Sequence, residues 1–101
     1  MTFLQKKPVS AGDILTIKLQ TAEELIVRVE RDEENTLTVS SPLTLTYGAQ
    51  GVGMTAWIVT GEPEAHITID KSKIMCMTPT LKKAADQYVQ STSGVKPVNR
   101  N

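Results

Sequence analysis

The chain has 101 residues and a mass of 11.0 kDa, a length that allows one compact domain and little more. Its 11 basic and 11 acidic side chains cancel, which excludes the uniformly positive surface of a general polyanion-binding protein. The charges are unevenly distributed along the chain. Residues 1–70 carry five basic and ten acidic side chains, whereas residues 71–101 carry six basic and one acidic. We therefore expect any positive site to involve the last third of the chain.

The composition predicts a soluble protein of the reducing cytoplasm. A single cysteine, Cys76, excludes an internal disulfide framework. The N-terminus lacks the apolar run of a signal peptide, and no apolar run of the chain is long enough to span a bilayer. A chain of this size buries too little surface for more than marginal stability as a monomer, so we also expect oligomerisation.

Alternation of apolar and polar residues dominates from residue 13 to residue 78 and predicts antiparallel strands. The expected strands span residues 14–19, 24–30, 36–47, 54–59, 66–70 and 73–77. Short links of hairpin length join the first strands. Pro42 interrupts the long third strand, and because proline cannot donate a ladder hydrogen bond, that strand either bends there or lies partly on an edge. Sharp bending suits a small barrel.

The one helical signal lies near the C-terminus and predicts a short helix over about residues 78–90. Thr78 is the expected N-cap, Pro79 the first helical residue, and apolar side chains follow at three- and four-residue spacing as far as Tyr88. Residues 91–101 hold turn formers without a period and are expected to form a flexible tail. The expected organisation is one domain over residues 1–90 and a tail.

Catalytic chemistry has little support in the residues. The chain offers one histidine, His66, expected as a half-exposed strand residue, and one cysteine, Cys76, expected as a small buried residue of an apolar strand. No metal-ligand spacing occurs, so we expect no enzyme activity, metal or cofactor. The glycine-rich stretch 48–53 lacks the following helix that a phosphate loop needs, and is expected to be a flexible connector between strands.

Binding has more support, although each signal has an ordinary alternative. Two ammonium groups and a hydroxyl in Lys71-Ser72-Lys73 suit a phosphate or a ribose, but a solvated lysine pair is as reasonable. Trp57 and Tyr47 could stack on bases, but with four aromatic residues in the chain, packing in the core or an interface is the expected role. The acidic turn at residues 32–35 is expected to be a solvated hairpin tip.

The order of these segments resembles the Sm/LSm family. Residues 17–29 and the Asp32…Asn35 loop with the strand after it resemble the family's first motif, and residues 67–77 resemble its second. In the bacterial Hfq branch the turn of the second motif contains a Lys-His pair, in whose place this chain has Lys71-Ser72. The pattern around Ser41-Pro42-Leu43 and the Thr-Pro before the helix look most like a divergent Sm-like group of T4-type phages, notably those of marine cyanobacteria.

The resemblance implies an all-β fold, a small and strongly bent five-stranded antiparallel barrel of the Sm-like or SH3-like type, followed by the short helix. It implies a homo-oligomeric ring of roughly five to seven subunits in the cytoplasm of a phage-infected bacterium. It also implies binding of single-stranded RNA, or DNA, and no membrane partner. The residues that match the binding segments are Asp32, Asn35, Lys71, Ser72 and Lys73.

The acidic loop leaves a second function open. Glu33 and Glu34 lie where the family approaches nucleic acid, and their charge would repel phosphate. These charges, together with Ala22 and Val27 where the family usually has glycine, favour the alternative of a phage structural or adaptor ring that binds other proteins.

Overall fold

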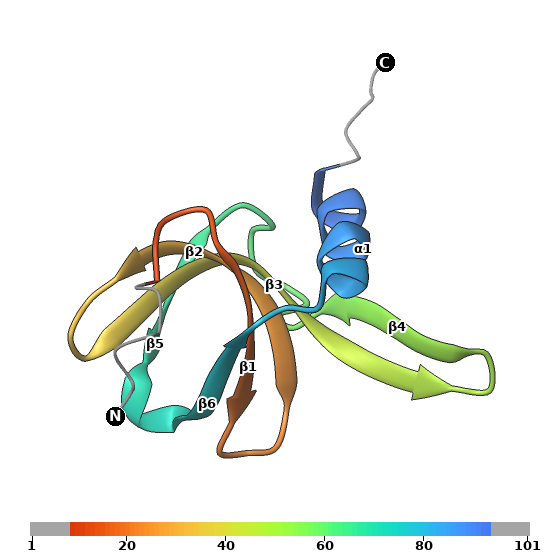
Figure 1. Cartoon of the computed structure of the whole chain (residues 1–101), viewed down its shortest axis with the longest axis horizontal. Helices are drawn as coiled ribbons and strands as arrows, with labels where there is room; N and C mark the ends of the chain where they lie inside the picture. Colours follow the sequence, from red (N-terminus) through yellow and green to blue (C-terminus); the bar gives the residue numbers. More distant parts are fainter. Residues whose placement is uncertain (1–8, 94–101) are drawn as a thin grey trace.

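The computed structural model describes residues 9–93 and consists of a curved antiparallel sheet with one C-terminal helix (Figure 1). The strands are β1 (Ile14–Leu19), β2 (Glu24–Asp32), β3 (Thr36–Gly48), β4 (Gly51–Ala56), β5 (His66–Asp70) and β6 (Ile74–Pro79). A single turn of 3₁₀ helix, η2 (Lys71–Lys73), joins β5 to β6, and the helix α1 (Lys82–Ser93) follows. The antiparallel sheet with a short C-terminal helix confirms the expected class of fold.

Strand β3 organises the sheet. One edge of β3 pairs with β2, whereas its other edge pairs first with β5 and then with β4. Beyond β2 lie β1 and β6, in the order β4-β3-β2-β1-β6. The five strands that the family resemblance implied are wrong, because the sheet has six strands, as the alternation predicts, and the long β3 is shared by two successive partners. Within residues 9–93, β5 and β6 are not paired with each other, so the sheet is open between them.

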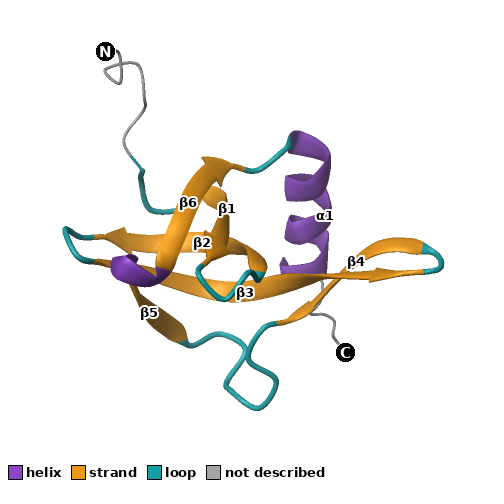
Figure 2. Ribbon diagram, turned by 90° about the horizontal axis from the view of Figure 1, so that it is seen from below, coloured by secondary structure: helices purple, strands orange, loops and turns teal. Residues whose placement is uncertain are grey.

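The division of β3 follows from a bend at Ser41 and Pro42. Ser41 has a φ of +49°, and the register between β2 and β3 shifts between Ile26 and Arg28 at the same level. Such an irregularity turns a strand sharply. The bend expected from Pro42 is therefore present, and the second half of β3 leaves the body with β4 as a two-stranded arm (Figures 1 and 2).

The core lies on the concave face of the sheet. The alternating residues expected to face inward in the first two strands are all buried, and they are joined by residues of β3 and β5. These core residues are Leu15, Ile17, Leu19, Leu25, Val27, Val29, Leu37, Val39 and Ile69. Each such side chain contributes about 1.5–3 kcal/mol by leaving water, so this cluster is the main source of stability.

Tyr88 attaches α1 to the other side of the sheet. Its side chain is fully buried, and its hydroxyl donates to the carbonyl oxygens of Ser41, at 2.7 Å, and Ser40, at 3.2 Å. The Arg28 guanidinium lies 5.8 Å from the ring centroid. Burial raises the pKa of Tyr88 to about 12. The helix is thus fixed to the carbonyl groups at the bend of β3.

The helix differs from the expected span at both ends. It begins at Lys82 because Thr78 and Pro79 belong to β6, where Pro79 pairs with Leu15 of β1. The N-cap and first-turn roles expected for Thr78 and Pro79 are therefore wrong. At the other end residues 91–93, expected in the tail, are helical, and the remainder of that tail lies outside the described residues.

Two further expectations change in the structure. The strand expected over residues 54–59 is β4, at Gly51–Ala56, and the glycine stretch forms a tight hairpin in which Gly48 pairs with Gly51. It is not a flexible connector, since the cross-strand ladder with β3 includes it. Cys76 is exposed rather than buried, because it pairs with Lys18 on the outward face of β6.

In residues 9–93 no helix is long and apolar enough to cross a membrane. The same residues hold no group of three or more histidine, cysteine, aspartate or glutamate side chains arranged for a metal ion.

Candidate functional site

The turn between β2 and β3 meets η2 at one edge of the sheet. The register of β3 and β5 places Thr36 opposite Asp70, so the residues just outside this pair, Asn35 and Lys71, become neighbours. The backbone N–H of Lys71 donates to the carbonyl oxygen of Asn35 at 2.9 Å, and the Lys71 ammonium lies 2.6 Å from Oδ1 of Asp32. Three of the five residues expected in a binding site are therefore brought together.

The ion pair between Lys71 and Asp32 changes the electrostatics of this edge. The two side chains are 29% and 28% exposed, so the pair is partly removed from water and screened less than a surface pair. The carboxylate compensates the Lys71 charge. Next to it, Glu33 and Glu34 are exposed at the tip of the turn, and Glu33 also pairs with Arg31 at 3.0 Å. The expected solvated, acidic hairpin tip is thus present.

Ser72 is held within the turn by its neighbours. Asp70 caps η2, since its Oδ1 accepts from the Ser72 backbone N–H at 2.9 Å. This bond, with a further hydrogen bond from the Ser72 side chain, lowers the pKa of Asp70. On the other side Gln20 donates from its side-chain amide to the Ser72 carbonyl at 2.7 Å, and from its backbone to the Lys73 carbonyl at 2.9 Å. These contacts give η2 a fixed shape.

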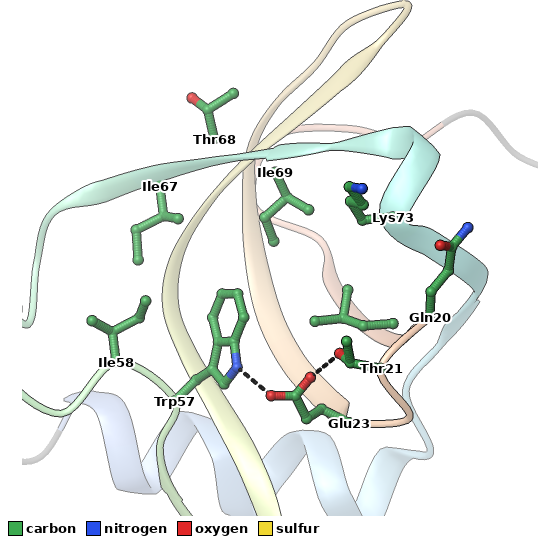
Figure 3. Close-up of a pocket in the computed structure, with 10 residues that line it drawn as sticks. Gln20, Thr21, Glu23, Trp57, Ile58, Ile67, Thr68, Ile69 and Lys73 are labelled. Carbon is green, nitrogen blue, oxygen red and sulfur yellow. Dashed lines mark hydrogen bonds between the residues drawn. The ribbon is translucent and has the colours of Figure 1, made fainter.

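Lys73 lies on a different surface from Lys71. It lines an open groove of about 760 Å³ together with Trp57 and apolar residues such as Ile67 and Ile69 (Figure 3). Lys73 makes no ion pair within the described part of the chain. The structure therefore separates the two lysines. Lys71 is paired with Asp32 beside Asn35, whereas Lys73 lines the groove without an ion pair in the described residues.

Glu23 fixes the tryptophan in this groove. The indole N–H of Trp57 donates to Oε2 of Glu23 at 3.2 Å, and the Thr21 hydroxyl donates to the other oxygen of the same carboxylate (Figure 3). The Thr21 bond first, and then the Trp57 bond, lower the pKa of Glu23. Trp57 packs against the core, as expected for packing rather than free stacking, whereas Tyr47 is 74% exposed on the arm.

Gln20 and Glu23 were not expected in the site. Both lie in the link between β1 and β2. Gln20 reaches η2 because β6 pairs antiparallel with β1 and brings Ile74 beside Leu19. Glu23 reaches Trp57 because β3 lies between β2 and β4 and pairs with both. The feature that could have identified them is the short polar link between β1 and β2, which lies opposite the basic turn η2. This placement depends on the pairing of β1 with β6, and local sequence patterns do not reveal which distant strands pair.

Comparisons with protein-family models and with curated proteins found no match for this chain.

Proposed function

We propose that the chain is an Sm-like, ring-forming protein that binds single-stranded nucleic acid, RNA in preference to DNA, and catalyses no reaction. The observation that carries the proposal is the contact of Lys71 with Asn35 and Asp32, which joins the turn before β3 to the turn after β5. These are the two segments through which the family resemblance implies binding. The proposed location is the cytoplasm of a phage-infected bacterium.

The free edges of β5 and β6 support assembly into a ring. Each has one edge without a strand partner among the described residues, and such edges favour pairing with another chain. Met77 lies opposite the buried Ile17 in the register, yet Met77 is 38% exposed and Met75 is 65% exposed. Pairing of β6 with β5 of a neighbour would cover both. Because the two edges differ, the contact is head-to-tail and can close into a ring of roughly five to seven subunits.

Within such a ring each residue of the site has a distinct role. Lys73, which makes no ion pair in the described part of the chain, holds backbone phosphate. The side chains of Asn35 and Ser72 are hydrogen-bonding groups for a base or a ribose, the contacts by which single strands are read. Asp32 and Lys71 position the two turns relative to each other. Repetition around the ring multiplies a weak contact into useful affinity.

Fluorescence anisotropy with labelled oligo-U and oligo-dT tests this proposal. We expect binding of oligo-U at about 50 mM salt that weakens at about 150 mM, as phosphate contacts require. The Lys71→Ala/Lys73→Ala double variant should bind at least about tenfold more weakly, with most of the loss in Lys73→Ala alone. Lys82→Ala is the matched control, because it removes a lysine from the exposed face of α1.

Two results would contradict the proposal. Wild-type protein that binds neither oligonucleotide at low salt would exclude nucleic acid as the ligand. Unchanged binding by the double variant would exclude the assigned residues.

A second function, an adaptor ring that binds other proteins in phage assembly, is favoured by the charge of the same edge. Asp32 compensates Lys71, and the exposed Glu33 and Glu34 make the tip of the turn negative. An assembled ring that fails to bind either oligonucleotide at low salt would support this second function.

A further inference from the structure

The arm formed by the second half of β3 and by β4, residues 43–56, has one apolar face. Residues paired across a ladder share a face, and every second residue of a strand returns to it. The register therefore gathers Leu43, Leu45, Tyr47, Val52, Met54 and Ala56 on one side. The other side carries threonines and glycines. Tyr47 is 74% exposed and Val52 is 56% exposed, so the outer part of the apolar face is uncovered.

The arm also lacks the charges that keep exposed strands apart. The sequence contains no charged residue between Glu34 and Glu62. Natural edge strands usually carry charged side chains, especially lysine, or a proline, and these residues prevent pairing with other chains. A two-stranded ribbon is also marginally stable by itself, so an arm of this kind gains stability from a surface that covers it.

The apolar face continues into a hollow at the base of the arm. This hollow measures about 360 Å³ and is lined by Leu43 and Ala56 of the arm together with Ile58, Pro63 and Ile67. Glu62 and Glu64 also line it and are exposed. The arm thus presents an aromatic side chain near its tip and an apolar hollow with carboxylates at its base.

We propose that the apolar face of the arm binds the same face of a second copy of this chain, with the two arms antiparallel. In this arrangement Tyr47 at each tip enters the hollow at the base of the other arm, where the carboxylate of Glu62 or Glu64 accepts a hydrogen bond from the tyrosine hydroxyl. The contact is isologous, so each arm both gives and receives a tyrosine.

The lack of charge on the arm favours a second copy of the arm as its partner. An uncharged face supplies no cation to hold phosphate, which disfavours nucleic acid and anionic lipid headgroups as its partner. A partner that placed charges against this face would leave them buried and unpaired. The other exposed large apolar residues of the described chain lie outside the arm. Ile58 and Val59 follow β4 in a loop, Met75 and Met77 lie on β6 after Lys73, and Leu81 and Val89 lie next to or on α1, which begins with two lysines. Within residues 9–93 the arm is the exposed apolar surface that carries no charge over the length of two paired strands, so a second arm matches it in length and in charge.

This association is independent of the proposed ring, since it uses neither the β5 nor the β6 edge. A ring with its arms paired becomes a double ring with an even number of subunits.

Sedimentation equilibrium of the full chain tests the arm contact. The wild type should have a mass corresponding to an even number of subunits, and Val52→Lys and Tyr47→Lys should each halve it. A lysine buried at such a contact weakens association at least about tenfold. Thr46→Lys is the matched control, because it adds the same charge to the opposite face of the arm, and Tyr47→Phe keeps the aromatic ring; both should retain the wild-type mass.

The mass after substitution separates this proposal from the ring. If the ring exists, Val52→Lys should leave a single ring that still binds oligo-U with wild-type affinity per subunit. A wild-type mass in both lysine variants would overturn the arm contact and would indicate that the apolar face binds a different protein. A wild-type chain that sediments as one subunit would overturn the arm contact and the ring together.

Discussion

Replacing Asp32 by asparagine should make the positive charge of Lys71, which the Asp32 carboxylate now neutralises, available to a ligand. Asp32→Asn removes the negative charge but keeps the size of the side chain, and its amide oxygen still accepts from the Lys71 ammonium, which lies 2.6 Å from Oδ1 in the wild type. Lys71 therefore keeps its place beside Asn35 while its charge becomes available. We expect Asp32→Asn to bind oligo-U more tightly than the wild type.

The size of the effect follows from the number of phosphates contacted. Each additional phosphate contact with a single strand steepens the dependence of log K on log salt by about 0.7, so a rise from about 50 to 200 mM salt costs the variant about 2.6-fold more affinity for each Lys71 engaged. At low salt the gain should be about threefold or more, as removal of a partly buried competing charge implies.

Anisotropy titrations of labelled oligo-U at several salt concentrations measure both quantities. Asp86→Asn is the matched control, because it removes an equal charge and releases Lys82, 3.1 Å away, from an exposed ion pair on α1. Affinity and salt dependence should change more in Asp32→Asn than in Asp86→Asn. Equal changes in the two variants would mean that net charge alone matters, and no gain in Asp32→Asn would refute the role given to Lys71.

Two predictions concern the attachment of α1 to the bend of β3. Tyr88→Phe should lower the free energy of unfolding by about 1–2 kcal/mol, because two buried carbonyl groups lose their donor. Burial raises the pKa of Tyr88 from 10.0 to about 12, so the folded state keeps a proton that the unfolded state releases; this contribution to stability is present below pH 10 and is lost as the pH rises towards 12. Urea unfolding at pH 9 to 12 should show that loss in the wild type and not in Tyr88→Phe, and a parallel decline in both would contradict it. Ser41→Gly should stabilise the fold by about 0.5 kcal/mol, because φ is +49° and glycine adopts this region without strain. Ser40→Gly, at a strand position without a positive φ, should destabilise the fold, in part because the Ser40 hydroxyl donates to Glu30 at 2.6 Å. A loss of stability in Ser41→Gly would argue against strain at the bend.

Strands with clean alternation could be predicted from local sequence. The segments 14–19 and 66–70 have the expected bounds because each buries one face and ends at polar turn residues. The start of α1 could not be predicted in this way. Thr78 and Pro79 form a good local helix start, but pairing of Pro79 with Leu15 extends β6 through them. A tertiary contact between segments 64 residues apart decided against the local preference.

The exposure of Cys76 has a similar cause. An apolar run between two methionines indicates a strand that is covered on both faces. In β6 every residue from Met75 to Pro79 is exposed, so the face that carries Cys76 stays in water.

The candidate site was predicted in part. The family resemblance, rather than any local pattern, implied that Asp32, Asn35 and Lys71 act together, and the geometry brings them into contact. The separation of Lys73 from Lys71 could not be predicted, because Lys71 pairs with Asp32 whereas Lys73, two residues later in the 3₁₀ turn, lines the groove. The clamp made by Gln20 depends on the pairing of β1 with β6 and had no local signal.

The most direct test of the proposed function is sedimentation velocity of labelled oligo-U, followed through the label, in the presence of the wild-type protein at about 50 mM salt. The sedimentation rate of the label reports both whether the protein binds oligo-U and the size of the assembly that binds it. We predict that the label moves with a closed assembly of roughly five to seven subunits, or twice that number if the arms pair. A label that sediments free, or with a single 11.0 kDa subunit, would contradict the account.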